Sequence, residues 1–127
     1  MPITDYKFEH RVFFALETGF LDEQDADEWA RRLMEVAQKS PEPIVALVDA
    51  RTAVGMNVKA ESIFIKASFT PNLAAVVVIT NPGGIIHATT IKMLGQPGYT
   101  RLFGTEEQAQ AHVAEILAQF RDDVSEE

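Results

Sequence analysis

The sequence has no cysteine and no apolar run near the length of about 20 residues that a membrane-spanning helix needs. Without cysteine, the chain has no disulfide, no thiolate nucleophile and no cysteine-based zinc site. The first residues, Met1 to Asp5, also lack the basic and apolar regions of a signal peptide. These absences predict a cytoplasmic protein with no integral membrane insertion.

Basic residues are few and unevenly distributed. The chain of 127 residues has a formal net charge of −8, which argues against nucleic-acid binding, since that binding needs lysine and arginine to neutralise phosphates. Residues 44–104 nevertheless carry five basic side chains against two acidic ones. These basic side chains are either an ordinary solvated surface or the border of a site for something anionic. They are Arg51, Lys59, Lys66, Lys92 and Arg101.

The length fits one domain, which we place at residues 1–121, followed by an acidic tail at 122–127. Apolar patterning predicts strands at 3–8, 11–18, 44–48, 73–79 and 100–103. Apolar spacings of three and four predict helices at 22–39, 58–69, 85–94 and from 105 onward. Gly19 should end the second strand, and 49–52 should be a loop. The order β-β-α-β-α-β-α-β-α predicts an α/β fold, with a mixed and mostly parallel sheet and covering helices.

Two of the predicted helices begin at recognisable capping residues. Asp22 is a suitable N-cap and is followed by an acidic first turn. Thr105 and Gln108 have the spacing of a capping box. On the first helix, Trp29 lies on the apolar face, where it is either the core anchor of the helix or a platform for a ligand.

Two segments and the element order carry a resemblance to a known family. Residues 101–109 read Arg-Leu-Phe-Gly-Thr-Glu-Glu-Gln-Ala, and residues 44–49 read Ile-Val-Ala-Leu-Val-Asp. With a hairpin before the first helix, the chain from about residue 3 to residue 120 resembles the SpoIIAA-like or STAS-like family, which includes bacterial anti-sigma factor antagonists. The first segment is similar to the family's last strand and the start of its last helix. The second is similar to the strand that leads into the family's regulatory loop.

The sequence departs from this family at the regulatory loop. In phosphorylated antagonists, an Asp-Ser-Ser-Gly segment follows the strand and carries the phosphorylated serine. When Gly55 is placed on that glycine, Thr52, Ala53 and Val54 take the three preceding positions, and both serines are missing. The chain therefore resembles divergent stand-alone SpoIIAA-like proteins, which are similar in fold to both STAS and CRAL-TRIO lipid-binding domains.

Polar residues that follow the two central strands are the first candidates for a binding site. Open α/β sheets bind ligands at the carboxyl ends of their strands, and the second loop leads into a helix whose free N–H groups suit an anion. The loop sequence Asn-Pro-Gly-Gly is also that of an ordinary turn, and two charged residues that alternate along a strand favour a salt bridge. The candidates are Asp49, Arg51, Thr52, Asn81, Gly83, Gly84 and His87.

The segment 54–69 has more apolar residues than a thin helix easily buries on a sheet. It is a well-buried helix, a dimer contact, or the wall of an apolar groove for a lipid-like ligand whose headgroup meets a nearby arginine or lysine. We include Met56, Lys59, Phe64 and Lys66 among the candidate binding residues. The groove interpretation requires a cavity beside this helix.

The sequence offers no metal-binding spacing, no cofactor motif and no catalytic constellation. His87 has no second ligand at a metal-binding spacing, and no serine has the flanking residues of a nucleophile elbow. An enzyme would need Asp49, His87 and Thr90 to meet in one cleft. We therefore expect no metal and no cofactor.

These observations favour a non-enzymatic regulatory module that binds another protein through the loop and helix at 51–69 and forms a homodimer. The alternative is a binding protein for a small apolar anion, such as a fatty acid. An enzyme is the third interpretation.

Because both serines of the family's loop are missing, we expect no kinase-dependent switching there. Mass spectrometry of protein purified from its own cells should find Thr52 unmodified. Stoichiometric phosphate on Thr52 would contradict this expectation.

Overall fold

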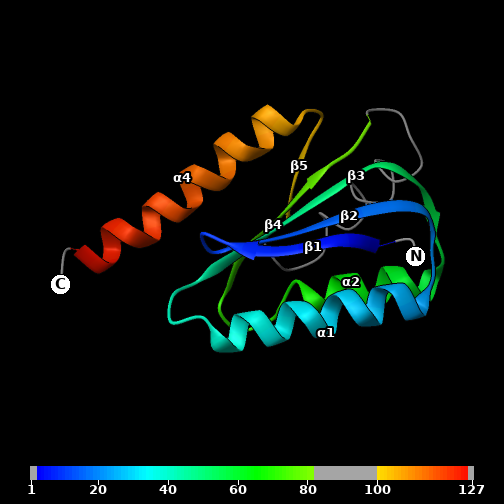
Figure 1. Cartoon of the computed structure of the whole chain (residues 1–127), viewed down its shortest axis with the longest axis horizontal. Coiled ribbons are helices and arrows are strands. Elements are labelled where there is room, and N and C mark those ends of the chain that lie inside the picture. The colour runs from blue at the N-terminus through cyan, green and yellow to red at the C-terminus, as the bar shows by residue number, and fades with distance from the viewer. Residues whose placement is uncertain (1–2, 82–99, 126–127) are drawn as a thin grey trace.

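The computed structural model describes residues 3–81 and 100–125 as an α/β fold (Figure 1). The predicted helix at 85–94 lies outside the described residues. The elements are β1 (Ile3–Glu9), β2 (Val12–Leu21), α1 (Glu23–Lys39), β3 (Ile44–Met56), α2 (Val58–Ala67), β4 (Leu73–Ile79), β5 (Thr100–Phe103) and α4 (Glu106–Ser125).

The strands form one five-stranded sheet in the order β1-β2-β3-β4-β5. β1 pairs with β2 antiparallel, and every later pair is parallel, which confirms the predicted mixed sheet. Helices α1 and α2 lie side by side on one face, and α4 lies on the other (Figure 1). Within the described part of the chain, no helix has the length and apolar content to cross a bilayer.

The hairpin between β1 and β2 turns at His10 and Arg11, one residue later than predicted. Both residues have left-handed φ angles, 53° and 66°, the backbone conformation of a tight two-residue hairpin turn. Along β1, Asp5 also has a positive φ of 55°, and the pairing with β2 shifts register between Thr4 and Lys7. This bulge breaks the regular ladder of the outermost strand.

Two predicted strand ends are wrong. β2 does not stop at Gly19 but runs to Leu21, with Gly19 at a φ of +65°. β3 does not end before the predicted loop at 49–52 but runs to Met56. The pairing of β3 with β4 stops at Asp49, whereas its pairing with β2 continues to Met56. Beyond Asp49, β2 and β3 therefore continue as strands because they pair with each other.

The extended part of β3 contains two extra residues. Between the pairs Leu16–Asp49 and Thr18–Thr52, β3 advances three residues while β2 advances two. A second extra residue, Val54, lies between the partners of Gly19 and Phe20. Such bulges bend a strand and redirect its side chains. We call this two-stranded extension, residues 18–21 with 52–56, the arm.

The inner core lies between the sheet and helices α1 and α2. Asp22 caps α1 as predicted, since its Oδ1 accepts a hydrogen bond of 3.0 Å from the Asp25 N–H. Trp29 is buried and packs edge-on against Phe64 of α2, with 5.3 Å between ring centroids. The structure therefore confirms Trp29 as a core anchor.

The outer core lies between the sheet and α4, whose apolar face packs on β3, β4 and β5. The helix begins as predicted, because the Thr105 hydroxyl oxygen accepts a hydrogen bond of 3.2 Å from the Gln108 N–H. The helix runs as far as Ser125 and so includes part of the predicted acidic tail.

One carboxyl group lies in the inner core. Glu17 of β2 is buried, and burial raises its pKa from 4.5 to about 8. It lies close enough to Tyr6 to affect that phenol, whose pKa is raised to about 12, first by burial and then by Glu28, with Glu17 and Asp25 adding to the shift against Arg32. The Glu17 carboxyl is therefore neutral in the folded protein at pH 7.

Replacing Phe64 with alanine should lower the free energy of unfolding by about 3–5 kcal/mol, because it removes the ring that joins α2 to Trp29. Val58→Ala on the exposed side of the same helix should cost less than about 0.5 kcal/mol. Urea denaturation of both variants measures the difference. Equal losses in the two variants would contradict this account of the inner core.

Glu17 should make stability fall with rising pH. Its pKa is higher in the folded than in the unfolded chain, so unfolding releases a proton between about pH 4.5 and 8. Its contribution is full below about pH 4.5 and is lost at up to about 1.4 kcal/mol per pH unit until about pH 8. Urea denaturation across this range should show the slope removed in Glu17→Gln and kept in Glu35→Gln, which changes an exposed carboxylate. An unchanged slope in Glu17→Gln would show that another group titrates.

Candidate functional site

Asp49 and Arg51 form a two-point ion pair at the place where β3 passes the end of β4. Arg51 Nε lies 3.0 Å from Asp49 Oδ1, and Arg51 Nη2 lies 2.7 Å from Asp49 Oδ2. The Arg51 backbone N–H also donates to Asp49 Oδ1, at 3.2 Å. The structure thus confirms the salt bridge that the alternation predicted. Asp49 takes Arg51 Nε and Nη2 and balances the guanidinium charge, so an anionic ligand at Arg51 would compete with this carboxylate.

The electrostatics of this pair agree with its geometry. The hydrogen bond from the Arg51 side chain holds the pKa of Asp49 below its usual range, and Asp49 raises the pKa of Arg51. Glu106, in the first turn of α4, adds a second carboxylate, with Oε2 at 3.8 Å from Arg51 Nη2. Both groups therefore stay charged at neutral pH, and neither is a proton donor or acceptor for catalysis there.

Asn81 joins this cluster from the end of β4, since its Nδ2 donates a hydrogen bond of 2.6 Å to the Arg51 carbonyl oxygen. The structure therefore brings Asp49, Arg51 and Asn81 together, as predicted for strand ends. Gly83, Gly84 and His87 lie outside the described residues, and so does Thr90.

The other predicted binding residues lie in different surroundings. The Thr52 hydroxyl is in the arm and donates to the Glu17 carbonyl oxygen at 3.3 Å. Met56 is half-buried against the inner core, and Lys59 pairs with Glu23 at 3.5 Å. The remaining two, Phe64 and Lys66, differ sharply: the ring of Phe64 is in the core, so the binding surface excludes it, whereas Lys66 is exposed.

The arm carries an exposed apolar surface of which the sequence predicted the part within 54–69 and missed Phe20. Phe20, Val54 and Val58 have 54%, 61% and 80% of their surface exposed, and we call these three residues the arm patch. Phe20 pairs with Gly55 across the arm, and its ring lies over the glycine at van der Waals distance, since a Cβ at Gly55 would be 3.4 Å from it. Val58 opens α2 beside the arm, because the Asn57 N–H bonds to the Leu21 carbonyl oxygen. The sequence signal was a glycine on each strand, which marks an irregular strand pair.

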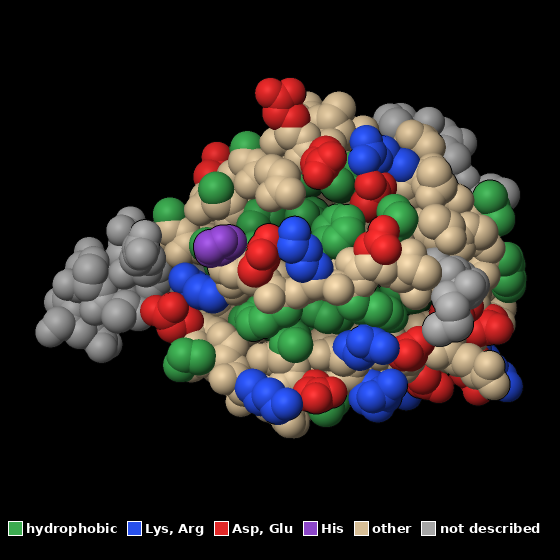
Figure 2. Space-filling view, viewed as in Figure 1, with side chains coloured by type: hydrophobic (Ala, Val, Ile, Leu, Met, Phe, Trp, Pro, Cys, Tyr) green, Lys and Arg blue, Asp and Glu red, His purple; other side chains and the backbone are tan. Residues whose placement is uncertain are grey.

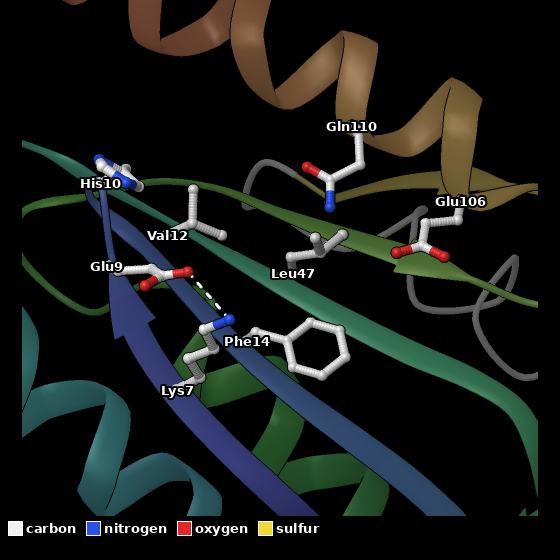
Figure 3. A pocket seen from close by; sticks show the side chains of 8 residues that line it. All are labelled: Lys7, Glu9, His10, Val12, Phe14, Leu47, Glu106 and Gln110. Carbon is white, nitrogen blue, oxygen red and sulfur yellow. Dashed lines mark ion pairs between the residues drawn. The ribbon is translucent and has the colours of Figure 1, made fainter.

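A shallow groove of about 390 Å³ runs between α4 and the β1–β2 hairpin (Figure 3). Val12, Phe14 and Leu47 form its apolar floor, and Gln110 and Glu106 approach it from α4 (Figure 3). Figure 2 shows hydrophobic side chains exposed in the hollow beneath this helix. The charges on its β1 side are satisfied locally, because Lys7 Nζ lies 2.9 Å from Glu9 Oε1.

A second groove, of about 410 Å³, lies between α1 and α2. Met34 and Phe69 stand on its two sides with about half of their surface exposed, and Ile63 is half-buried between them. Asp27 and Lys66 provide its charges. This open groove lies beside the C-terminal part of the segment 54–69.

Histidine and acidic side chains are groups that could hold a metal ion or act as catalytic acids and bases. Within residues 3–81 and 100–125, no three histidine or acidic side chains are grouped so that they could hold a metal ion. His10 lies in the hairpin turn and His112 on α4, where it packs against Phe103. The cluster at Asp49 and Arg51 is an ion pair that Asn81 joins to the end of β4.

No family profile matches this sequence, and no curated protein sequence matches it either. Solved structures do match. An uncharacterised DUF3478 protein with a SpoIIAA-like fold from Shewanella loihica is 19% identical, with a TM-score of 0.63 over 87% of this chain and 93% of that one.

Two further solved structures that match are both of anti-sigma factor antagonists. An anti-sigma factor antagonist from Mycobacterium paratuberculosis is 16% identical, with a TM-score of 0.64 over 88% of this chain and 94% of its own. The anti-sigma factor antagonist SpoIIAA, in its unphosphorylated form, is 13% identical, with a TM-score of 0.60 over 85% of this chain and 94% of its own. With the sheet order and the two helix layers described above, these matches identify the fold of this chain as SpoIIAA-like.

Proposed function

We propose that this chain is a non-enzymatic regulatory module that binds another protein through the arm patch. The observation that carries the proposal is the exposure of Phe20 and Val54 on the arm and of Val58 at the start of α2 beside it. Exposed apolar residues that gather in this way mark protein-binding surfaces more often than scattered single residues do. Two solved neighbours are named as antagonists of an anti-sigma factor, and such a role is exercised on a protein.

The surroundings of the arm patch fit a protein partner. The Asp49–Arg51 pair and the Lys59–Glu23 pair place charges of both signs near the exposed apolar residues. A polar rim around an apolar centre is the usual composition of a protein interface. Phe20 supplies the large aromatic side chain that such centres favour.

The loop chemistry suggests binding that phosphorylation does not regulate. Ala53 and Val54 occupy the family's two serine positions, and the neighbouring hydroxyl, Thr52, already donates to the backbone of Glu17. We propose that partner choice is set by the shape and apolar character of the arm. A cytoplasmic location and a homodimeric state remain part of the same proposal.

The fatty-acid alternative is weaker, because most of the cations it requires are occupied. Arg51 pairs with Asp49, and Lys59 pairs with Glu23. Lys66 borders the groove between α1 and α2, but Asp27 borders the same groove and would repel a carboxylate headgroup.

The double change Phe20→Ser and Val54→Ser should abolish capture of a specific protein from an extract of the source cells, because it removes the apolar centre of the arm patch. The protein retained by the wild type is identified by mass spectrometry, produced on its own, and titrated against each variant by calorimetry. We expect the double variant to bind at least about tenfold more weakly.

Phe8→Ser is the matched control, because Phe8 is also exposed but lies on β1, away from the arm. It should bind like the wild type. If every protein captured by the wild type is equally retained by the arm variant, the arm patch is not the binding surface.

A further inference from the structure

We propose that the groove between α1 and α2 is the surface through which two copies of this chain associate, as a dimer with twofold symmetry. This inference rests on the homodimeric part of the proposed function. It does not depend on the arm, which lies at another part of the molecule.

The groove presents apolar surface from both helices. Met34 projects from α1 with 47% of its surface exposed, and Phe69 follows α2 with 53% exposed. Ala30 and Ala67 also line the groove, and their small side chains allow close approach to the helices there. A helix face with large apolar residues at its borders and alanines at its centre suits packing against another helix pair.

The charges on this groove are unpaired. Asp27 stands on the α1 side and Lys66 on the α2 side, and neither side chain has a hydrogen bond or ion pair with any residue in the described ranges. Other charged side chains of these helices are paired within the chain: Arg32 with Glu28 at 3.2 Å, Lys39 with Glu35 at 3.3 Å, and Lys59 with Glu23 at 3.5 Å.

One acid and one base on opposite sides of an apolar groove make a self-complementary surface. In a twofold dimer, a contact between residue i of one copy and residue j of the other always occurs twice, with the copies exchanged. Asp27 of each copy then meets Lys66 of the other, and the two Met34–Phe69 surfaces cover each other. A fatty acid would satisfy Lys66 but leave its carboxylate near Asp27, so a second copy is the better occupant.

The test is sedimentation velocity of the full chain from about 1 to about 200 µM. The wild type should dimerise, and Asp27→Lys and Lys66→Asp should each weaken dimerisation at least about tenfold, because each places like charges opposite one another twice. An equimolar mixture of these two variants should form a heterodimer, since all four facing charges then have opposite partners.

The mixture separates the interface from a folding defect, because mixing cannot repair a misfolded chain. Glu35→Lys, which changes an α1 charge outside the groove, is the matched control and should dimerise like the wild type. A dimer that both single variants leave intact, or two folded variants that fail to associate when mixed, would overturn the proposed interface.

A wild type that stays monomeric across the whole concentration range would overturn both the interface and the homodimer, and would leave binding through the arm untouched. Native mass spectrometry of the same samples tests whether a small anion, such as a fatty acid, occupies the groove instead of a second copy. A bound mass of a few hundred daltons that disappears in Lys66→Asp would assign the groove to a small anion, against the proposal.

Discussion

The pairing of β3 with β2 is the constraint on which the rest of the molecule depends. The first half of β3 lies at the centre of the sheet and is buried by helices on both faces, so one strand joins the inner and outer cores. Its second half has passed the end of β4 and is held by β2 through a parallel ladder with two bulges. The same strand therefore builds the core at one end and presents the arm at the other.

Local signals predicted most of the elements, because caps and periodicity act over a few residues. Asp22 and Thr105 cap the helices at the predicted positions, and the apolar run at 44–48 became a strand buried on both faces. The ends of β2 and β3 were missed for a physical reason. Each strand continues only because the other pairs with it, and a glycine such as Gly19 weakens a strand in any window read alone.

The residues of the candidate site were also predicted correctly where local pattern decides their position, and missed where long-range packing does. Asp49 and Arg51 paired as their alternation predicted, because the two residues are neighbours on one strand. The exposure of Phe20 and the burial of Phe64 depend instead on which elements pack against them, over distances along the chain that no local pattern spans. Sequence reasoning thus located the arm's polar border and the apolar residues of 54–69, but it missed Phe20 and wrongly placed Phe64 on the binding surface.

The outermost strand, β1, limits the ways in which copies of this protein can meet. Its bulge at Asp5 interrupts the row of backbone groups that another strand would need, and the paired charges of Lys7 and Glu9 stand farther along it. Bulges and charges of this kind are how natural sheets prevent edge-to-edge growth. A protein with such an edge can keep exposed aromatic and aliphatic side chains for recognition elsewhere on its surface without extending its sheet into open-ended fibres.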